Sequence, residues 1–334
     1  MKISVLGSGG WGTALALLLL ENGHDVTLWS YSEAENEVLR TMGENPKLKG
    51  VPLPAELRYS TDLACASGCD IVVLATPSFA IRSTAHQVRK HLTPGTVLVS
   101  VSKGIEKGTS RRLDEVIEEE TESAFPVVAL CGPSHAEEVG RGVPTGVVSA
   151  SKCEEAAKKV QDAFMSPRFR VYTSCDPVGV ELAAALKNVI ALCAGVCDGL
   201  GYGDNTKAML MTRGLTETAR LGVALGGHKD TFAGLAGVGD LIVTCCSMHS
   251  RNRRCGILIG QGVPVEDAVK QIDGVVEGYF AAANAKELAD KTGVEMPITQ
   301  AAYEVLYEGR DVRTVVTELM TREKRNEIED AGWG

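Results

Sequence analysis

Short apolar runs alternate with helical segments along the first half of the chain. Residues 3–6 are apolar, residues 12–21 are rich in Ala and Leu with a helical pattern, and residues 25–29 are again typical of a strand. Further Val-rich runs cover residues 71–75, 97–101, 127–130 and 147–150, and residues 169–172 add a last one. Such unbroken runs are typical of parallel strands covered on both faces. With helices between them, they predict an α/β fold with a doubly wound, mostly parallel sheet.

The strand pattern ends near residue 175, and long helical segments follow. We expect helices over residues 179–196, 205–225, 240–258 with a break, 265–271, 278–292 and 298–307. Asp176-Pro177 lies between the two patterns, and a residue before proline disfavours the helical conformation. A chain of 334 residues is also longer than one core usually serves. We therefore predict two domains, residues 1–175 and an all-helical second domain of residues 176–334.

A glycine-rich motif stands between the first predicted strand and the first predicted helix. Gly7-Ser8-Gly9-Gly10-Trp11-Gly12 satisfies the G-x-G-x-x-G pattern, which is weak alone but specific in a strand–turn–helix context. Here Gly7 can make the tight turn, Gly9 lets the backbone approach a pyrophosphate, and Gly12 permits close packing of helix on strand. The helix N-terminus then faces the phosphates. The motif predicts a Rossmann dinucleotide-binding unit.

The end of the second predicted strand does not separate NAD from NADP. NAD-selective proteins usually carry an acidic residue there, which accepts a hydrogen bond from the ribose 2′-hydroxyl. In this chain Trp29 is followed by the uncharged segment 30–32 with Tyr31 at its centre, Glu33 comes slightly late, and no Arg is adjacent. These residues leave both cofactors open, with a lean towards tolerance of NADP.

Charge and cysteine content exclude several kinds of ligand and cellular location. The formal net charge of -9 disfavours nucleic acid and anionic membrane surfaces, so an anionic substrate must be held by a few local Lys or Arg side chains. The ten cysteines contain no C-x-x-C pair, so no metal site is expected.

Without a secretory signal pattern, the thiols are expected to be reduced and buried in a cytoplasmic protein. Residues 178–196 have the length of a membrane span, but Glu181, Lys187 and Asn188 interrupt them, which favours a buried core helix over membrane insertion.

Lys187 and Asn188 lie in the middle of the otherwise apolar segment 181–192. An unpaired ammonium is costly to desolvate, so this lysine is expected to have a partner or a chemical role. Burial would lower its pKa and make it a competent proton donor to the alkoxide formed when a ketone receives a hydride, with Asn188 bonding to the same oxygen. The alternative is a lysine whose stem is buried and whose charge reaches solvent at a domain surface.

Two segments of the second half carry further polar groups. Asp240 and Thr244 are one helical turn apart and share a helix face, so both could reach a substrate. Asp240 follows a glycine-rich entry, however, and helix capping with ordinary packing is the simpler interpretation. The segment Ser250-Arg251-Asn252 combines hydroxyl, guanidinium and amide groups that suit a phosphate or carboxylate, against the alternative of a solvated basic face.

Two other segments follow predicted strands, at the carboxyl edge where open α/β sheets bind ligands. Lys103 comes directly after the 97–101 run, and Gly132, Ser134 and His135 come after the 127–130 run. Gly132 and Ser134 can present backbone and hydroxyl donors to the same crevice, whereas a structural role is favoured for His135.

Taken together, six motifs resemble those of one family. They are Gly7 to Gly12 with Trp11, Ser102-Lys103-Gly104, Gly132-Pro133-Ser134-His135-Ala136, Leu186-Lys187-Asn188, Gly239-Asp240-Leu241 and Ser250-Arg251-Asn252. In order and spacing, from the first strand to about Tyr307, the chain closely resembles the bacterial-type NAD(P)-dependent glycerol-3-phosphate dehydrogenase family. The resemblance implies reversible reduction of dihydroxyacetone phosphate to sn-glycerol 3-phosphate for glycerophospholipid synthesis, with NAD or NADP as cofactor.

The resemblance also implies roles for individual residues. Lys187 would be the general acid and base, and the catalytic set would be Lys187, Asn188, Asp240 and Thr244. The small phosphorylated triose would be bound by Lys103, Gly132, Ser134, Lys187, Asp240, Ser250, Arg251 and Asn252, with Arg251 on the phosphate. The cofactor would contact Gly7, Gly9, Gly10, Trp11, Gly12, Tyr31, Lys103, Ala136, Arg251, Val275 and Glu277. Tyr31 departs from the family pattern, since many relatives carry Arg or His there to favour a 2′-phosphate. A homodimer is a further expectation, because helical second domains of related dehydrogenases often dimerise.

Two other functions remain open at this point. A ketopantoate-reductase-like or hydroxy-acid dehydrogenase also pairs a Rossmann unit with a helix lysine, but Lys103 and Arg251 favour a phosphorylated substrate. A redox sensor that binds a dinucleotide without turnover would leave the buried Lys187-Asn188 pair and the anion site unexplained.

Overall fold

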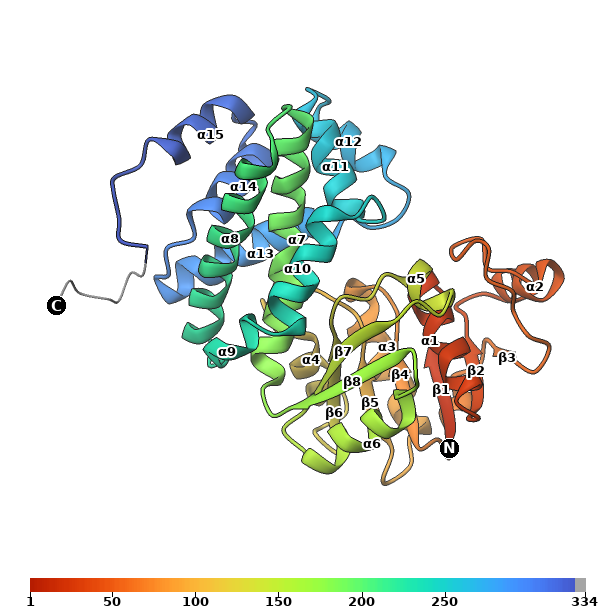
Figure 1. Cartoon of the computed structure of the whole chain (residues 1–334). Helices are drawn as coiled ribbons and strands as arrows, with labels where there is room; N and C mark the ends of the chain where they lie inside the picture. Colours follow the sequence, from red (N-terminus) through yellow and green to blue (C-terminus); the bar gives the residue numbers. More distant parts are fainter. Residues whose placement is uncertain (328–334) are drawn as a thin grey trace.

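The computed structural model describes residues 1–327 and shows a twisted sheet flanked by helices, with a second group of helices packed beside it (Figure 1). The sheet part contains, in chain order, β1 (Lys2–Leu6), α1 (Gly10–Glu21), β2 (Asp25–Trp29), α2 (Glu33–Met42), β3 (Arg58–Ser60), β4 (Ile71–Leu74), α3 (Ile81–Val88), β5 (Val97–Ser100), α4 (Leu113–Glu120), β6 (Val127–Cys131), α5 (Ala136–Gly140), β7 (Thr145–Ala150), α6 (Glu154–Phe164) and β8 (Phe169–Ser174). Short 3-10 turns lie at η1 (Leu63–Ala66), η2 (Ser78–Ala80) and η3 (Arg89–His91).

Within residues 1–327 the strands form one eight-stranded sheet in the order β3-β2-β1-β4-β5-β6-β7-β8. Strands β3 to β6 all pair in parallel. Because β2 lies on one side of β1 and β4 on the other, the chain reverses its direction of winding at β1, and ligands of open α/β sheets bind at this point. The predicted mostly parallel, doubly wound sheet is therefore confirmed, and the glycine-rich segment follows the strand at its switch point.

The 147–150 run was expected to be a parallel strand, but β7 runs antiparallel to β6, with Ala129 opposite Ala150, and pairs in parallel with β8 alone. The link between these strands contains only the five-residue helix α5, which is too short to carry the chain back along the sheet. An unbroken apolar run reports burial on both faces and says nothing about strand direction. The sequence pattern also missed β3, a three-residue edge strand without an apolar run.

Separate apolar cores lie on the two faces of the sheet at β1 and β4. Ile3 and Val5 of β1 point into one core, whereas Leu6 points into the other. In β4, Ile71 and Val73 share the first core, and the residues between and after them join the second. This alternation follows the two-residue period of a strand, and it explains why apolar residues occupy both faces of these runs.

The rest of the described chain is helical. It contains α7 (Pro177–Gly199), α8 (Asp204–Ala224), α9 (Lys229–Phe232), the π-helical turn η4 (Leu235–Gly239), α10 (Asp240–Cys246), α11 (Arg251–Gly260), α12 (Val265–Gln271), α13 (Glu277–Thr292), α14 (Pro297–Glu308) and α15 (Val312–Met320). The segment expected over 240–258 with a break is the pair α10 and α11, while α15 was not predicted. Residues 328–334 of the predicted second domain lie outside the described residues.

Helix α7 is the centre of the helical part, in contact with α8, α10, α11 and α13 (Figure 1). Asp176 caps its start by accepting a hydrogen bond from the Gly179 backbone N at 2.8 Å, and Pro177 occupies the first turn. Among the described helices, α7 alone is long and apolar enough to cross a membrane, but 94% of its apolar window is buried inside the protein. As predicted, it is a core helix.

Candidate active site

Lys187 is buried in the middle of α7, with 6% of its side chain exposed. Its Nζ lies 2.8 Å from Oδ1 of Asp240 and donates to Oγ1 of Thr244 at 2.5 Å. The Thr244 hydroxyl in turn donates to the Asp240 backbone O at 2.6 Å. The alternative of a lysine reaching solvent is therefore wrong, and α10 supplies the partners that the desolvated ammonium requires.

Lys103 approaches the same carboxylate from the sheet. It follows β5, and its Nζ donates to Oδ2 of Asp240 at 2.8 Å and to the Gly132 backbone O at 3.0 Å. The Ser134 hydroxyl also donates to this carbonyl, at 3.0 Å. Residues from the ends of β5 and β6 and from α10 therefore meet at one place, as expected for the carboxyl edge of an open sheet.

Asp240 does not act as a helix cap. Gly239 holds the N-cap position of α10 without a side-chain bond, and Asp240 is the first helical residue. Its carboxylate, which is 1% exposed, instead forms ion pairs with the ammonium groups of Lys103 and Lys187. The capping interpretation is wrong because the carboxylate pairs with the buried Lys187 and the half-buried Lys103, and charge-assisted bonds of this kind are stronger than a bond to a neutral backbone N–H.

The electrostatics of this cluster suit proton transfer. Burial lowers the pKa of Lys187 to about 8, although the charge of Asp240 opposes this shift. Burial alone would raise the pKa of Asp240, but the two neighbouring ammonium groups of Lys103 and Lys187 hold it below its ordinary value. With two cations and one anion, the cluster attracts an anionic ligand and holds a lysine that can exchange a proton near neutral pH.

Asn188 and Asn252 link α7 to α11 and α13. Nδ2 of Asn252 donates to Oδ1 of Asn188 at 2.9 Å, and the Gly278 backbone N donates to Oδ1 of Asn252 at 2.8 Å. A Cβ on Gly278 would collide with the Asn188 backbone O, so glycine is required for α13 to approach this closely. Nδ2 of Asn188 makes only a long 3.4 Å bond to Ala184 O, which leaves it able to donate to a ligand.

The Ser250-Arg251-Asn252 segment forms the start of α11. The Ser250 hydroxyl accepts from the Arg253 backbone N at 3.2 Å, which leaves its own proton free to be donated. Arg251 is exposed, and its guanidinium lies so close to Gly274 that a Cβ there would be 2.6 Å from Nη1. A hydroxyl, a guanidinium and the positive end of a ten-residue helix thus occur together, a combination that suits a phosphate.

The glycine-rich turn has the shape that a dinucleotide needs. Gly7 has φ +127°, and a Cβ there would lie 2.6 Å from Ala75 O, while a Cβ on Gly12 would collide with Gly7 O. At Gly9, by contrast, a Cβ would meet nothing within 4 Å. The turn is therefore closed towards the sheet and open above the N-terminus of α1, where the pyrophosphate of a dinucleotide fits.

Three other predicted cofactor contacts surround this turn. A Cβ on Gly10 would lie 3.7 Å from the Cβ of Ala136, so α5 begins beside the glycine loop. Nε1 of Trp11 is buried and has no hydrogen-bond partner within residues 1–327. Tyr31, just beyond the end of β2, is 87% exposed and packs edge-on against Trp29 at 6.4 Å between ring centroids.

Val275 and Glu277 bring the helical part to the sheet part. Glu277 begins α13, Val275 lies just before it, and the Ser78 hydroxyl bonds to both Glu277 carboxylate oxygens at 3.1 Å. Burial raises the pKa of Glu277, and the Ser78 bond partly offsets this. Ser78 lies in η2 after β4, so the pair joins the carboxyl end of β4 to the start of α13.

Two residues beside the site, Asn45 and Ser78, were not predicted from the sequence. Asn45, which is buried, donates to Ser8 O at 3.0 Å and to Thr13 Oγ1 at 2.6 Å, and so holds the glycine turn from the far side. The Asn45-Pro46 dipeptide is a turn signal that marks such a loop, although it does not reveal the contact. Ser78 carries no comparable signal.

The remaining sequence expectations concern cysteine and histidine. All ten cysteines are unpaired, but Cys175 and Cys246 are exposed, so burial of every thiol was wrong. Both stand at helix boundaries, where packing is incomplete.

Residues 1–327 contain no group of three His, Cys, Asp or Glu side chains that could hold a metal ion. His135 is half-buried beside His249, with 5.7 Å between ring centroids, and burial lowers its pKa.

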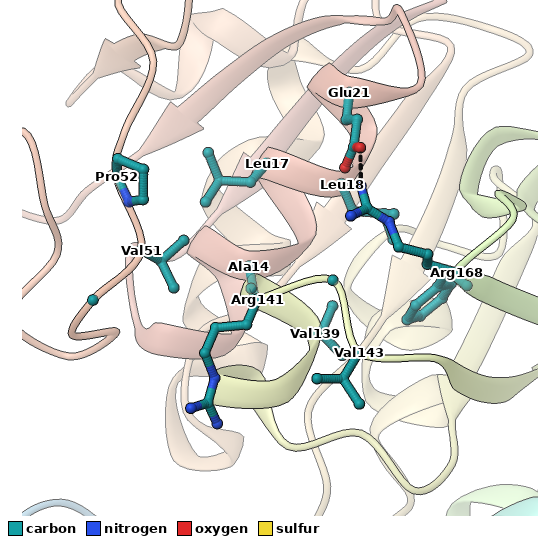
Figure 2. Close-up of a pocket in the computed structure, with 14 residues that line it drawn as sticks. Ala14, Leu17, Leu18, Glu21, Val51, Pro52, Val139, Arg141, Val143 and Arg168 are labelled. Atoms are coloured by element: carbon teal, nitrogen blue, oxygen red, sulfur yellow. Dashed lines mark hydrogen bonds and ion pairs between the residues drawn. The ribbon is translucent and has the colours of Figure 1, made fainter.

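A cavity of about 270 Å³ lies away from these groups, between α1, α5 and the loop at residues 50–52 (Figure 2). Leu17, Leu18, Val51 and Pro52 line it, and the ion pair of Arg168 with Glu21 crosses one side. None of the predicted site residues lines this cavity.

Comparisons with known proteins identify the family. The chain matches the model for the N-terminus of NAD-dependent glycerol-3-phosphate dehydrogenase over residues 2–157 and the model for its C-terminus over residues 176–317. A glycerol-3-phosphate dehydrogenase (NAD(P)+) of Desulfitobacterium hafniense is 51% identical, with 98% of this chain and 94% of the relative covered. The relative of the same name from Moorella thermoacetica is 52% identical, with 99% of both chains covered.

Solved structures give the same picture. The crystal structure of glycerol-3-phosphate dehydrogenase from Coxiella burnetii has a TM-score of 0.91 and 38% identity, covering 96% of this chain and 98% of that one. A ketopantoate reductase from Ralstonia eutropha has a TM-score of 0.63 at 16% identity, with coverage of 96% and 100%. The second likeness shows a shared fold alone and gives no support to a ketopantoate-type activity.

Proposed function

The chain belongs to the NAD-dependent glycerol-3-phosphate dehydrogenase family, and we propose that Lys187 is the general acid and base of its reaction. It is an NAD(P)-dependent oxidoreductase acting on a CH–OH group. The reaction is the reversible reduction of dihydroxyacetone phosphate to sn-glycerol 3-phosphate, which feeds glycerophospholipid synthesis. The buried Lys187–Asp240 pair, facing Lys103 and Thr244, is the observation that carries the proposal.

The position of the Lys187 ammonium determines which group gives and takes the proton. In the reducing direction the substrate carbonyl oxygen gains negative charge and takes a proton from Nζ of Lys187, and in the oxidising direction the neutral amine takes the hydroxyl proton. Asp240 and Thr244 hold Nζ in place, and Asn188 donates to the same substrate oxygen. Lys103 adds a second positive charge towards that oxygen.

The phosphate is held a short distance away by the start of α11. Arg251 anchors it, with Ser250 donating its free hydroxyl proton and Asn252 donating from an amide already fixed by Asn188 and Gly278. The whole substrate-binding set is Lys103, Gly132, Ser134, Lys187, Asp240, Ser250, Arg251 and Asn252. Fixing both ends of a three-carbon substrate orients its central carbon for reaction.

The cofactor, NAD or NADP, supplies or accepts the hydride when it is bound. The residues that would hold it are Gly7, Gly9, Gly10, Trp11, Gly12, Tyr31, Lys103, Ala136, Arg251, Val275 and Glu277. The open space at Gly9 and the start of α1 supports the placement of the pyrophosphate. Glu277, held by Ser78, supports a contact from the helical part.

We further propose two domains, residues 1–175 and 176–334, working as a cytoplasmic homodimer. The change from strands to helices at Asp176-Pro177 supports the boundary, and ten unpaired cysteines support a reducing compartment. The net charge of -9 supports independence from nucleic acid and from membranes. Sedimentation of the purified protein tests the dimer, and a single monomeric species would contradict it.

A direct assay tests the activity. Oxidation of NADH or NADPH is followed by absorbance with dihydroxyacetone phosphate, with phosphate-free dihydroxyacetone and with ketopantoate. We expect turnover with the phosphorylated ketone at a kcat/KM that far exceeds the other two. Equal rates with ketopantoate, or cofactor binding without turnover of any ketone, would overturn the proposal.

A further inference from the structure

Helices α7 and α11 pack backbone against backbone near the site. A Cβ on Gly195 of α7 would collide with the carbonyl O of Arg253, and a Cβ on Gly256 of α11 would collide with the carbonyl O of Leu192. No side chain separates the two helices at these points. A shift of α11 therefore moves it directly relative to the helix that carries Lys187.

Arg253 lies on this seam and bonds to three helix ends. Its Nε donates to Oδ2 of Asp198 at 2.7 Å, its Nη1 donates to Cys246 O at 2.8 Å, and its backbone N donates to Ser250 Oγ at 3.2 Å. The other Asp198 oxygen pairs with Lys207 Nζ at 2.6 Å. The three charged side chains are only 14–17% exposed, so solvent screens their attraction weakly.

These bonds fix the turn between α10 and α11 against the end of α7. Asp198 lies in the last turn of α7, Cys246 is the last residue of α10, and Ser250 caps α11. Positions 251 and 253 point to different sides of α11, since the Arg251 guanidinium lies against Gly274 while Arg253 faces Asp198. Arg253 therefore holds the segment without occupying the anion site.

We propose that Arg253, held by Asp198, is a positioning residue that sets the place of the Arg251 phosphate anchor relative to Lys187. The inference rests on the proposed function, because it assumes that the start of α11 binds the substrate phosphate. A guanidinium is suited to this task because its planar fork donates to a carboxylate and a carbonyl at once. A lysine at position 253 can reach only one of these acceptors with the same geometry.

Steady-state kinetics of the full-length protein test the proposal. In Arg253→Gln and Asp198→Asn we expect the KM for dihydroxyacetone phosphate, and the inhibition constant of inorganic phosphate, to rise about tenfold or more, since small misplacements of a binding group are costly. The kcat/KM for phosphate-free dihydroxyacetone, measured at saturating NADH, is expected to stay unchanged. Arg253→Lys should restore part of the phosphate affinity.

Lys207→Gln is the matched control, because it removes the second ion pair of Asp198 and leaves both side-chain bonds of Arg253 in place. Its KM is expected to match the wild type. If Arg253→Gln fails to fold, Asp198→Asn carries the test, since it removes a charge with almost no change in volume. Equal losses with both ketones, an unchanged KM in Asp198→Asn, or the same loss in Lys207→Gln would overturn the positioning role.

Failure of the inference is distinguishable from failure of the proposed function. If Arg251→Ala raises the KM for dihydroxyacetone phosphate and Arg253→Gln does not, the anchor stands and the positioning role is wrong. If Arg251→Ala leaves that KM unchanged, the anchor itself is misplaced and the inference fails with it.

Discussion

Lys187 and Asp240 form an ion pair of 2.8 Å between Nζ and Oδ1, with the two side chains only 6% and 1% exposed. A buried ion pair contributes little to stability, because the cost of desolvation offsets the attraction. Here the carboxylate is shared with Lys103 at 2.8 Å, so the cluster keeps a net positive charge. The arrangement is better explained by chemistry, since it holds a proton donor in place and attracts an anionic substrate.

The first prediction concerns Lys187 itself. Lys187→Ala should lower kcat by about 10²–10⁴-fold, because the substrate oxygen loses its proton donor. Asp240 keeps Lys103 as a partner in this variant, so no unpaired charge is left buried. The Kd for NADH, measured by fluorescence titration, should match the wild type. The exposed Lys152→Ala serves as the control, and normal turnover in Lys187→Ala would remove the mechanism.

The second prediction concerns pH. Burial lowers the pKa of Lys187 to about 8 while the charge of Asp240 opposes the shift. Reduction needs the protonated lysine, so its rate should fall as pH rises through about 8, and oxidation needs the neutral amine, so its rate should rise through the same range. In Asp240→Asn the opposing charge is gone, and the midpoint of both profiles should move to lower pH.

Profiles of kcat/KM in both directions measure this midpoint. The variant Glu33→Gln, at an exposed ion pair with Arg40 in α2, should leave the midpoint in place. A midpoint that moves to higher pH in Asp240→Asn, or that does not move, would show that another group controls the rate.

The sequence was sufficient to predict features that depend on local patterns. An apolar helix with a lysine at its centre favours a buried ammonium, because the apolar residues one turn away on either side are expected to be packed, although the pattern left a solvent-reaching lysine open. The glycine turn was likewise predictable, since its steric requirements lie within six residues and the flanking strand and helix.

Features that depend on tertiary contact were not predictable from the pattern. Asp240 and Lys103 lie 137 positions apart, and nothing in either segment indicates that the carboxylate is drawn from the helix cap to two ammonium groups. The direction of β7 and the contact of Asn45 with the glycine turn also depend on how the links fold back. The family resemblance predicts which residues form the site, but their hydrogen-bond partners depend on the tertiary structure.

The third prediction separates cofactor binding from folding. A Cβ on Gly9 meets nothing within 4 Å and its backbone is extended with φ -66°, so Gly9→Ala should keep the wild-type Tm while the Kd for NADH rises about tenfold or more. A Cβ on Gly12 collides with Gly7 O, so Gly12→Ala should be destabilised by about 1–3 kcal/mol. Thermal unfolding and cofactor titration measure both effects. A large loss of Tm in Gly9→Ala would place that residue inside the packed structure.

The fourth prediction concerns the phosphate anchor. Arg251→Ala should raise the KM for dihydroxyacetone phosphate about tenfold to a hundredfold, since a hydrogen bond to a charged group contributes about 1.5–3 kcal/mol. Stability should hardly change, because Arg251 is exposed. An equal loss of kcat/KM with phosphate-free dihydroxyacetone would contradict the anchor role.

The fifth prediction concerns the choice between NAD and NADP. Tyr31 is 87% exposed and makes a T-shaped contact with the Trp29 ring, so replacing it leaves the core intact. Tyr31→Arg places a guanidinium beyond the end of β2, where a 2′-phosphate would lie, and should raise kcat/KM for NADPH about tenfold with little change for NADH. The gain should shrink as salt is added, because exposed charges are screened. Tyr31→Gln removes the ring without adding charge and should give no gain. If both cofactors change equally in Tyr31→Arg, position 31 does not approach the 2′ position of the ribose.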